Sequence, residues 1–331
     1  MPPALLTMMR IFRLAHVAWT NPGEAWERMQ DHFAERRDRC RPPCPYQVQL
    51  DWELRLHQML GVRWPCETTS EFWALWPRVL APFGAKGVQI GRGAFGGWGD
   101  GEAGLLRAVW HLVRHLRPDR VVETGVARGF TTRIILEALE RNGAGHLWSI
   151  DLPPALKPEL HGQVGAAVLD CLRHRWSYIE GSSAHRLSGL LSRLGQIDLF
   201  IHDSRHTERN VRFELERAWA ALRLGGAVVV DDIDLNWGFS SFREVCPDHP
   251  FLICYAEPLQ PDLPRFGAKG LFGITRKKAP APGIAAPDDE RAIVTFADLT
   301  TASGLTERGN DWGLRARILL SDLLLPRRIL R

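Results

Sequence analysis

The chain has 331 residues, 45% hydrophobic and 24% charged, which are ordinary proportions for a globular protein. Its 42 basic and 38 acidic residues nearly balance, so the overall charge gives no reason to expect nucleic acid, which needs a clustered basic face. No run approaches the ~18 apolar residues of a membrane span, and no cleavable leader is evident. The six cysteines are scattered and form no paired zinc set, which favours a reduced, cytoplasmic protein.

Residues 1–99 are expected to form a helical N-terminal cap region. Asn21 begins a helix that runs into the charged stretch 35–39, and prolines at 42, 43 and 45 end it. Further helices are expected over residues 51–60 and from residue 70 onward. We expect this region to cover the substrate side of the protein, and an extension that only completes the core is an equally good alternative.

A glycine-rich stretch follows at residues 91–99. It looks like a phosphate-binding loop but lacks the Lys-Ser/Thr ending of a P-loop, so a flexible linker or a mobile lid is the better interpretation. Asp100 can cap the amphipathic helix expected over residues 101–117.

From residue 120 the pattern alternates between strands and helices. Strands are expected at residues 120–124, 146–151, 175–180, 197–203, 226–231, 251–255 and 271–276. A helix over about 207–223 would end at Gly225. This order predicts an α/β fold with a Rossmann-like, doubly wound, mostly parallel seven-stranded sheet, and it places the main domain at residues 100–278. Residues 279–331 are expected to be a linker and a C-terminal tail, the C-terminal extension.

The first strand and its turn form the motif that predicts a ligand site. Val121 and Val122 suit a strand covered on both faces, and Gly125 and Gly129 bracket a tight turn before a helix. The next strand ends in Asp151, which is placed to bind ribose hydroxyls. An ordinary loop with helix-packing glycines is the alternative for the glycine pair alone.

The acid at the end of the first strand argues against a dinucleotide. Glu123 would repel a pyrophosphate but suits a positively charged ligand, and the G-x-G-x-x-G pattern is missing. The motif resembles that of the class I S-adenosylmethionine-dependent methyltransferases, which have an acid followed by G-x-x-x-G and a second acid ending strand 2. The resemblance implies S-adenosylmethionine as cofactor, bound by Glu123, Gly125, Gly129 and Asp151, with Ser182 near the adenine.

Three aspartates follow two later strands. Asp203 ends the strand 197–203, Asp231 ends the strand 226–231, and Asp232 follows in the turn. Because ligands in such sheets lie at the carboxyl ends of the strands, these side chains are expected to meet beside the cofactor. Converging carboxylates repel one another unless a cation neutralises them, and hard oxygen ligands select Mg²⁺. A helix cap at Asp203 and a solvated turn at Asp231-Asp232 are the alternatives.

This second constellation resembles the metal-dependent small-molecule O-methyltransferases, and the run His-Asp-Ser-x-His-Thr at 202–207 resembles a broad family of methyltransferases. The resemblance implies that Asp203, Asp231 and Asp232 hold the ion, with Asp203 also next to the cofactor. It also implies that His206, three positions after Asp203, is the catalytic base. A purely structural histidine is the alternative.

The expected function is therefore S-adenosylmethionine-dependent O-methylation of a small hydroxylated molecule, such as a sugar, polyketide or glycoside, with help from a divalent metal. The alternatives are a protein of the same fold with hydroxylase-associated chemistry, or a binding protein without catalytic activity. A nicotinamide dehydrogenase is disfavoured because the chain lacks the G-x-G-x-x-G motif. A homo-oligomer is possible, and no nucleic-acid partner is expected.

Overall fold

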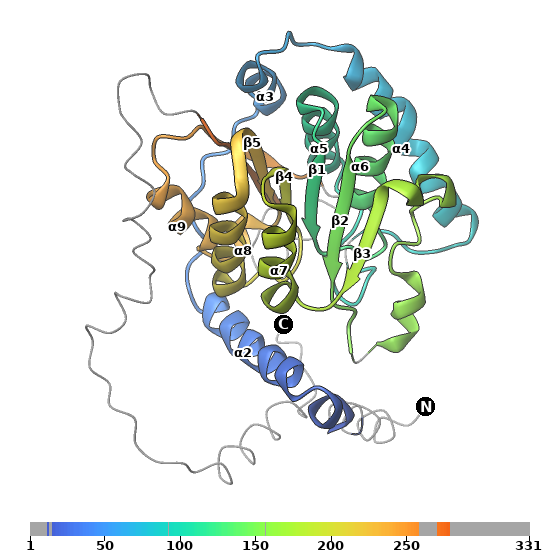
Figure 1. Cartoon of the computed structure of the whole chain (residues 1–331), viewed down its shortest axis with the longest axis vertical. Helices are drawn as coiled ribbons and strands as arrows, with labels where there is room; N and C mark the ends of the chain where they lie inside the picture. The colour runs from blue at the N-terminus through green and yellow to red at the C-terminus, as the bar shows by residue number, and fades with distance from the viewer. Residues whose placement is uncertain (1–11, 13–14, 92, 156, 258–269, 279–331) are drawn as a thin grey trace, which may run out of the picture. The chain divides into compact units, whose positions relative to one another are not determined.

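The computed structural model describes residues 12, 15–91, 93–155, 157–257 and 270–278. A seven-stranded sheet with the order β3-β2-β1-β4-β5-β7-β6 forms its centre (Figure 1). The strands are β1 (Arg120–Thr124), β2 (His146–Asp151), β3 (Trp176–Glu180), β4 (Ile197–His202), β5 (Leu222–Val230), β6 (Phe251–Tyr255) and β7 (Leu271–Arg276). Neighbours among β1 to β5 are parallel, and β7 is antiparallel to both β5 and β6. The predicted mostly parallel, doubly wound sheet is confirmed.

Helices cover both faces of this sheet. They are α2 (Pro22–Arg39), α3 (Trp52–Leu60), α4 (Glu67–Ala85), α5 (Ala103–Leu116), α6 (Phe130–Asn142), α7 (Ser183–Leu194), α8 (Glu208–Ala221) and α9 (Gly238–Val245), with short 3-10 helices η1 (Pro158–Gln163), η2 (Asp170–Arg175) and η3 (Ile233–Leu235). Successive strand residues point to opposite faces. Val121 accordingly packs in the core with α3 to α6, and Val122 packs in the core with α7 to α9.

The helix α2 crosses the end of the sheet where the parallel strands finish (Figure 1). Its N-terminus is capped by Asn21, whose side chain accepts a hydrogen bond from the Glu24 amide. Asp31 pairs with Arg205 at 2.9 Å, and Asp38 accepts the Glu208 amide at 2.8 Å. These contacts fix α2 over the turn that follows β4.

The helices α3 and α4 have a different place from α2. They contribute buried side chains such as Leu56, Phe72 and Leu75 to the core beside α5 and α6. The described residues from 15 to 278 form one compact unit, so the helices before residue 100 belong with the sheet. The predicted domain boundary between residues 99 and 100 stays a prediction.

Two local expectations from the sequence are wrong. The helix α8 ends at Ala221 and β5 begins at once, so Gly225 lies within an irregular part of the strand and does not cap the helix. Asp100 does not cap α5, whose N-cap is Glu102; its carboxylate accepts the Gly91 amide and pairs with Arg128 at 2.8 Å.

The glycine-rich stretch 91–99 is also more than a linker. The Arg128 guanidinium donates hydrogen bonds to the carbonyl oxygens of Gln89 and Ala94, and it lies under the ring of Phe95. The stretch is therefore tied to the turn after β1. The predicted tail at 279–331 lies outside the described residues.

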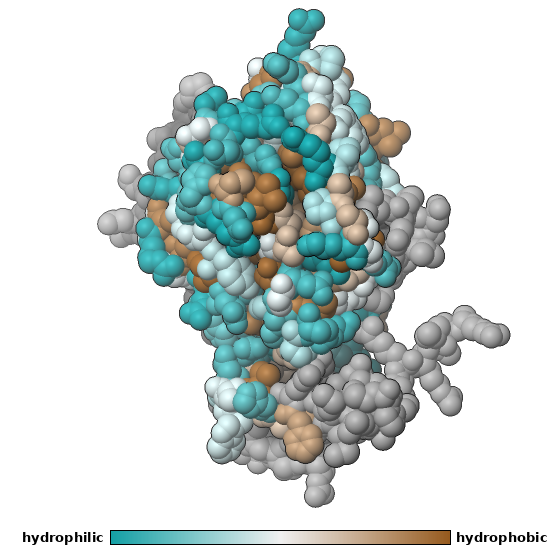
Figure 2. Space-filling view, turned by 90° about the vertical axis from the view of Figure 1, so that its right-hand side faces the viewer, coloured by the Kyte–Doolittle hydropathy of each residue, from teal (hydrophilic) through white to brown (hydrophobic). Residues whose placement is uncertain are grey.

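The face shown in Figure 2 is mostly hydrophilic, with hydrophobic residues in small, separate areas. The large apolar side chains that are exposed among the described residues are likewise spread along the chain. They include Trp19, Leu50 and Val245. Scattered apolar residues of this kind are normal on a protein surface. None of the described helices is long and apolar enough to cross a bilayer.

Candidate active site

A cavity of about 300 Å³ opens at the carboxyl ends of β1, β2 and β4. Its walls come from the turns after these strands, the 91–101 stretch and helix α2. They include the predicted residues Gly125, Gly129, Asp151, Ser182, Asp203, His206, Asp231 and Asp232. Of the residues singled out in the sequence, Glu123 alone is not on the wall. The topology thus gathers side chains that are up to 107 positions apart in the chain.

The turn after β1 needs glycine because of the neighbouring strand. Gly125 has φ +87°, and a Cβ at this position would lie 1.9 Å from the carbonyl oxygen of Asp203. No other residue could bring the β1 turn so close to the end of β4. Gly129, with φ +80°, is the N-cap of α6. The first glycine therefore sets the distance between the two turns that carry the predicted cofactor and metal residues.

Glu123 lies behind the cavity wall and is fully buried. Its Oε2 accepts hydrogen bonds from the hydroxyls of Thr132 and Ser149, at 2.8 and 2.7 Å. Its Oε1 has no hydrogen-bond partner among the described residues. Burial raises the pKa of this carboxyl to about 7, because an ion is poorly solvated there.

Asp151 is at the wall of the cavity. Its Oδ2 accepts the amide of Ala127 at 3.2 Å, so the β1 turn orients the carboxylate at the end of β2. Burial raises its pKa to about 6 despite the backbone amides that favour its charged form. A ligand that donates hydrogen bonds to Asp151 would stabilise the ionised carboxylate.

Ser182 connects the wall to helix α2. Its hydroxyl donates to Glu27 Oε2 at 2.7 Å, and His185 lies 3.2 Å from the same oxygen. Arg28 donates to the carbonyl oxygen of Pro153 after β2. The side of the cavity predicted to hold an adenine is thus closed by α2, a role that the helix could show only in the folded structure.

Carboxylates converge at the other side of the cavity. Burial and then the neighbouring Asp231 and Asp232 raise the pKa of Asp203 well above its usual value. Burial and then Glu102 do the same for Asp231, and burial and then Asp232 do so for Glu102. The common cause is that like charges in a poorly solvated space destabilise one another, so this cluster needs protons or a cation.

His206 lies among these acids. Its Nε2 is 3.8 Å from Asp203 Oδ1 and 3.7 Å from Asp232 Oδ2, and its ring packs against Trp98. Donor atoms of Asp203, His206 and Asp231 all lie within 4.8 Å of one another, close enough to share one metal ion. Asp232 has φ +51° and is the N-cap of η3.

A buried glutamate holds the turn that carries Asp203 and His206. Glu214 of α8 accepts hydrogen bonds from Thr124, Ser204 and Asn210 and is 2.6 Å from His202 Nδ1. Burial acts to raise the pKa of Glu214, but the His202 ring and the other donors keep it below its usual value. The turn after β4 is therefore fixed from inside the protein.

Two further acids of the site, Glu102 and Glu214, were not expected from the sequence. Glu214 had a recognisable feature, because it is an acid beside Val211 and Leu215 on the apolar side of its helix. Glu102 had none, because only the packing of α5 brings it to the ends of β4 and β5. Gly104 shows how close this packing is: a Cβ there would lie 2.5 Å from the carbonyl oxygen of Tyr255.

Residues 122–233 match a family model described as a methyltransferase domain. No curated protein sequence matches the chain. Solved structures with a similar fold include a putative O-methyltransferase from Klebsiella pneumoniae, at 16% identity over 62% of this chain and 90% of that one, with a TM-score of 0.42. The O-methyltransferase from Bacillus cereus in complex with SAH is 14% identical over 70% and 98% of the two chains, also at 0.42.

A third similar structure is the O-methyltransferase TomG from Streptomyces achromogenes in complex with SAM, at 15% identity over 71% and 100% of the chains and a TM-score of 0.41. The family match covers β1 to η3, which carry the glycine turn and the acids, and the strand order is the one expected for the class. Residues 122–233 therefore resemble a methyltransferase domain, the family whose model they match.

Proposed function

We propose that this protein transfers a methyl group from S-adenosylmethionine to an oxygen of a small hydroxylated molecule, with the help of a divalent cation, Mg²⁺ in the first instance. The observation that carries the proposal is the meeting of Asp203, His206 and Asp231 on the wall of the same cavity as Asp151. Asp151 would hold the methyl donor, and the neighbouring acids with their metal ion would hold the acceptor. This arrangement would bring donor and acceptor side by side for the transfer.

The cofactor side of the cavity fits a nucleoside. Asp151 can accept from the ribose hydroxyls, and the apolar side chains of Ile150 and Leu152 line the wall beside it. Ser182 lies on the same wall, held by Glu27. Bound there, S-adenosylmethionine supplies an activated methyl group. Glu123 would act from behind the turn, as a buried acid whose charge depends on the ligand in front of it.

The acid side fits a hard cation. Asp203, Asp231 and Asp232 offer carboxylate oxygens, and Asp231 Oδ1 is buried without a hydrogen-bond partner among the described residues. Oxygen-rich sites of this kind suit Mg²⁺. A bound ion would neutralise the acids and polarise an acceptor hydroxyl. Glu102 also faces the cluster, and by gaining or losing a proton it would change the total charge around the ion.

His206 is proposed as the general base. Its Nε2 faces the carboxylates of Asp203 and Asp232, which stabilise the imidazolium once the ring has taken the proton of the acceptor hydroxyl. Glu214 keeps the ring in place indirectly, by fixing the turn between Ser204 and Asn210.

The acceptor is proposed to reach this base from a second, smaller cavity of about 130 Å³. Trp98 and His206 belong to the walls of both cavities. The remaining wall of the second cavity combines charged side chains and Asn236 with the indole of Trp237, two prolines, Cys44 and Leu235. Polar groups beside aromatic faces suit a molecule rich in hydroxyls, such as a sugar or a glycoside.

The test is a mass-detected reaction of the full chain with S-adenosylmethionine, Mg²⁺ and a panel of polyols, glycosides and phenols. A product heavier by one methyl group, together with S-adenosylhomocysteine, is expected, and Asp203→Asn should remove it. Binding of the cofactor without any methylated product would favour a protein of this fold with other chemistry. Absence of cofactor binding would favour a binding protein. A cytoplasmic location and a homo-oligomer stay predictions.

A further inference from the structure

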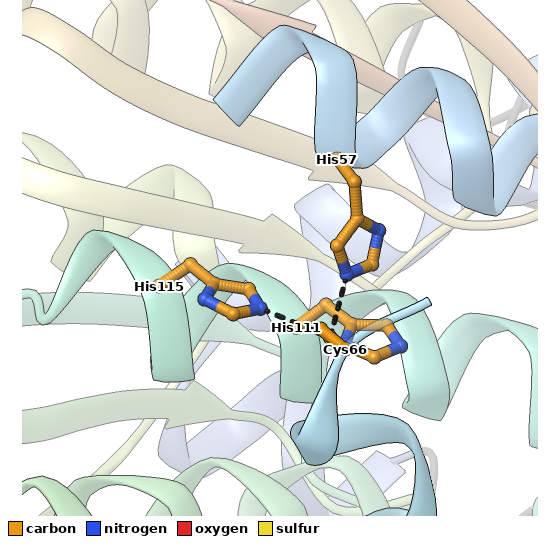
Figure 3. A group of neighbouring side chains, drawn as sticks. All are labelled: His57, Cys66, His111 and His115. Atoms are coloured by element: carbon orange, nitrogen blue, oxygen red, sulfur yellow. Dashed lines mark hydrogen bonds between the residues drawn. The ribbon is translucent and has the colours of Figure 1, made fainter. Parts of the chain in front are cut away.

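A second cluster of ligand-type side chains lies at the far end of α5 from the cavity. His57 comes from α3, Cys66 is the N-cap of α4, and His111 and His115 are one turn apart on α5, with all four side chains pointing toward a common point (Figure 3). One donor atom from each lies within 4.8 Å of all the others. The rise of an α-helix places these histidines roughly 14–20 Å from Glu102. The cluster is thus separate from the proposed reaction site.

The distances are close to those of a tetrahedral metal site. With bonds of about 2.0–2.3 Å, neighbouring donors around zinc are about 3.3–3.8 Å apart. Cys66 Sγ is 3.0 Å from His57 Nε2 and 3.5 Å from His115 Nε2. Thr68 Oγ1, which is 3.0 Å from the sulfur, is also 2.9 Å from His111 Nδ1. The other donor pairs lie within 4.8 Å of one another, so changes of up to about 1.5 Å in these distances would complete the tetrahedron.

The histidine rings are oriented as metal ligands are. His57 Nδ1 is 2.7 Å from the carbonyl oxygen of Glu53, which can only accept, so Nδ1 carries the hydrogen and Nε2 faces Cys66 with its lone pair. His111 turns Nδ1 toward the cluster and Nε2 toward the Glu53 carboxylate, 3.6 Å away. A backbone carbonyl and a carboxylate behind the rings are the usual partners of metal-bound histidines.

The chemistry of the donors selects the metal. Three nitrogens and one sulfur are soft or intermediate ligands, which suit zinc and exclude the hard Mg²⁺ proposed for the cavity. Burial lowers the pKa of His57 and His111, and together with the neighbouring histidines it lowers that of His115 to about 4, so the rings are neutral at neutral pH. Neutral imidazoles are the form that binds metal.

The charged groups around the cluster include one carboxylate close to the histidines. Glu53 pairs with Arg107, which also pairs with Glu257, and Arg114 acts on His115. A dication bound by the Cys66 thiolate adds one positive charge. The N-terminus of α4, where Cys66 lies, stabilises the negative sulfur.

We propose that His57, Cys66, His111 and His115 bind one zinc ion in a closed, four-ligand structural site. It fastens α3 and α4 to α5, and α5 in turn carries Glu102 into the cavity. The Thr68 hydroxyl, already 3.0 Å from the sulfur, donates to the thiolate. With four protein ligands the site has no open position, so its role is in stability and not in the methyl transfer.

The test measures zinc in the purified full chain. About one zinc ion per chain is expected to survive dialysis against a weak chelator. Cys66→Ser and His115→Gln should each lower the zinc content at least tenfold, as expected when a ligand is removed. Cys246→Ser and His146→Gln, which change the same residue types elsewhere, should leave the content unchanged. Glu53→Gln should weaken zinc binding by about 10–100-fold through the ring of His111.

Cobalt identifies the ligands without relying on the variants. Replacing zinc by Co²⁺ should give the intense visible bands of tetrahedral cobalt and a sulfur-to-metal charge-transfer band, and the latter should be lost in Cys66→Ser. Removal of zinc by a strong chelator should lower the unfolding temperature, and added zinc should restore it. Asp231→Asn should keep the full zinc content, which separates this site from the cavity. A metal-free native protein that takes up no stoichiometric zinc or cobalt would overturn the proposal and leave a hydrogen-bonded cluster.

Discussion

The two ends of helix α5 bury polar groups in opposite ways. At the N-terminal end, Glu102 joins Asp203 and Asp231, whose pKa values are raised by burial and by one another's charge. At the C-terminal end, His111 and His115, whose pKa values are lowered by burial, join the side chains of His57 and Cys66. The first cluster faces a cavity and needs protons or a cation. The second is closed, and its four donor atoms are of the types that bind zinc. One helix thus connects a site suited to reaction with a site suited to structure.

The largest expected effect is the loss of methyl transfer when the proposed Mg²⁺ site at the N-terminal end of α5 is damaged. Asp231→Asn should lower turnover by about 10³-fold or more, because a metal ion contributes several kcal/mol to such a reaction. The measurement is methyl transfer with and without Mg²⁺ after exhaustive chelation. Asp170→Asn, whose side chain is exposed, is the matched control. Full activity in a protein stripped of divalent ions would mean that the acids of the cavity work by protonation alone.

The second effect compares the turnover of variants at three histidines, one in the cavity, one buried behind it and one exposed. His206→Ala should lower turnover by about 10²–10⁴-fold, the usual loss on removing a general base, with cofactor affinity nearly unchanged. His202→Ala should cost stability, because buried Glu214 loses the ring that faces it, but turnover per folded molecule should fall much less. His174→Ala, at an exposed position, is the control. If turnover per folded His206→Ala molecule stays near native, another group takes the proton.

A third experiment measures the cost of burying an acid at the cavity end. The folded-state pKa of Glu123, about 7, lies above its ordinary value of 4.5. Its contribution to stability is therefore fully present below pH 4.5 and is lost as the pH rises through about 7. At about 1.36 kcal/mol per pKa unit the loss is up to about 3 kcal/mol.

Glu123→Gln should remove this loss, so the free energy of unfolding of the variant without cofactor should fall less between pH 5 and pH 8. Urea titrations at several pH values measure it, and Glu216→Gln at an exposed position is the comparison. Equal pH dependence in the variant and the native protein would show that Glu123 is already ionised when buried.

The smallest expected effect concerns the cofactor. Asp151→Ala should weaken the binding of S-adenosylmethionine by about 1.5–3 kcal/mol, the range for hydrogen bonds to a charged group. Because the pKa of Asp151 is raised to about 6, native affinity should increase as the pH rises through this value, and the variant should lose that dependence. Calorimetry between pH 5 and pH 8 tests both points. Unchanged affinity would remove Asp151 from the site.

Much of the fold could be predicted from local patterns. All seven strands were expected close to their observed positions, because each is a short, largely apolar run, and the five parallel strands are followed by or end in glycine or an acid. The error at the boundary between α8 and β5 also has an identifiable cause. Leu222 extends the apolar face of α8 in the sequence, but in the structure it begins β5, because pairing with β4 overrides helical preference there.

The sequence by itself determined which residues end the strands, and therefore which acids could meet at one edge of the sheet. That Asp151, Asp203, Asp231 and Asp232 share a wall follows from parallel topology, which chain order largely dictates. Only the tertiary structure decided what faces them. Glu102 and the helix α2 reach the cavity through packing between elements far apart in the chain. The group of His57, Cys66, His111 and His115 spans 58 positions and forms only where three helices meet, because side-chain periodicity records which face of a helix is buried and not which helix it will meet.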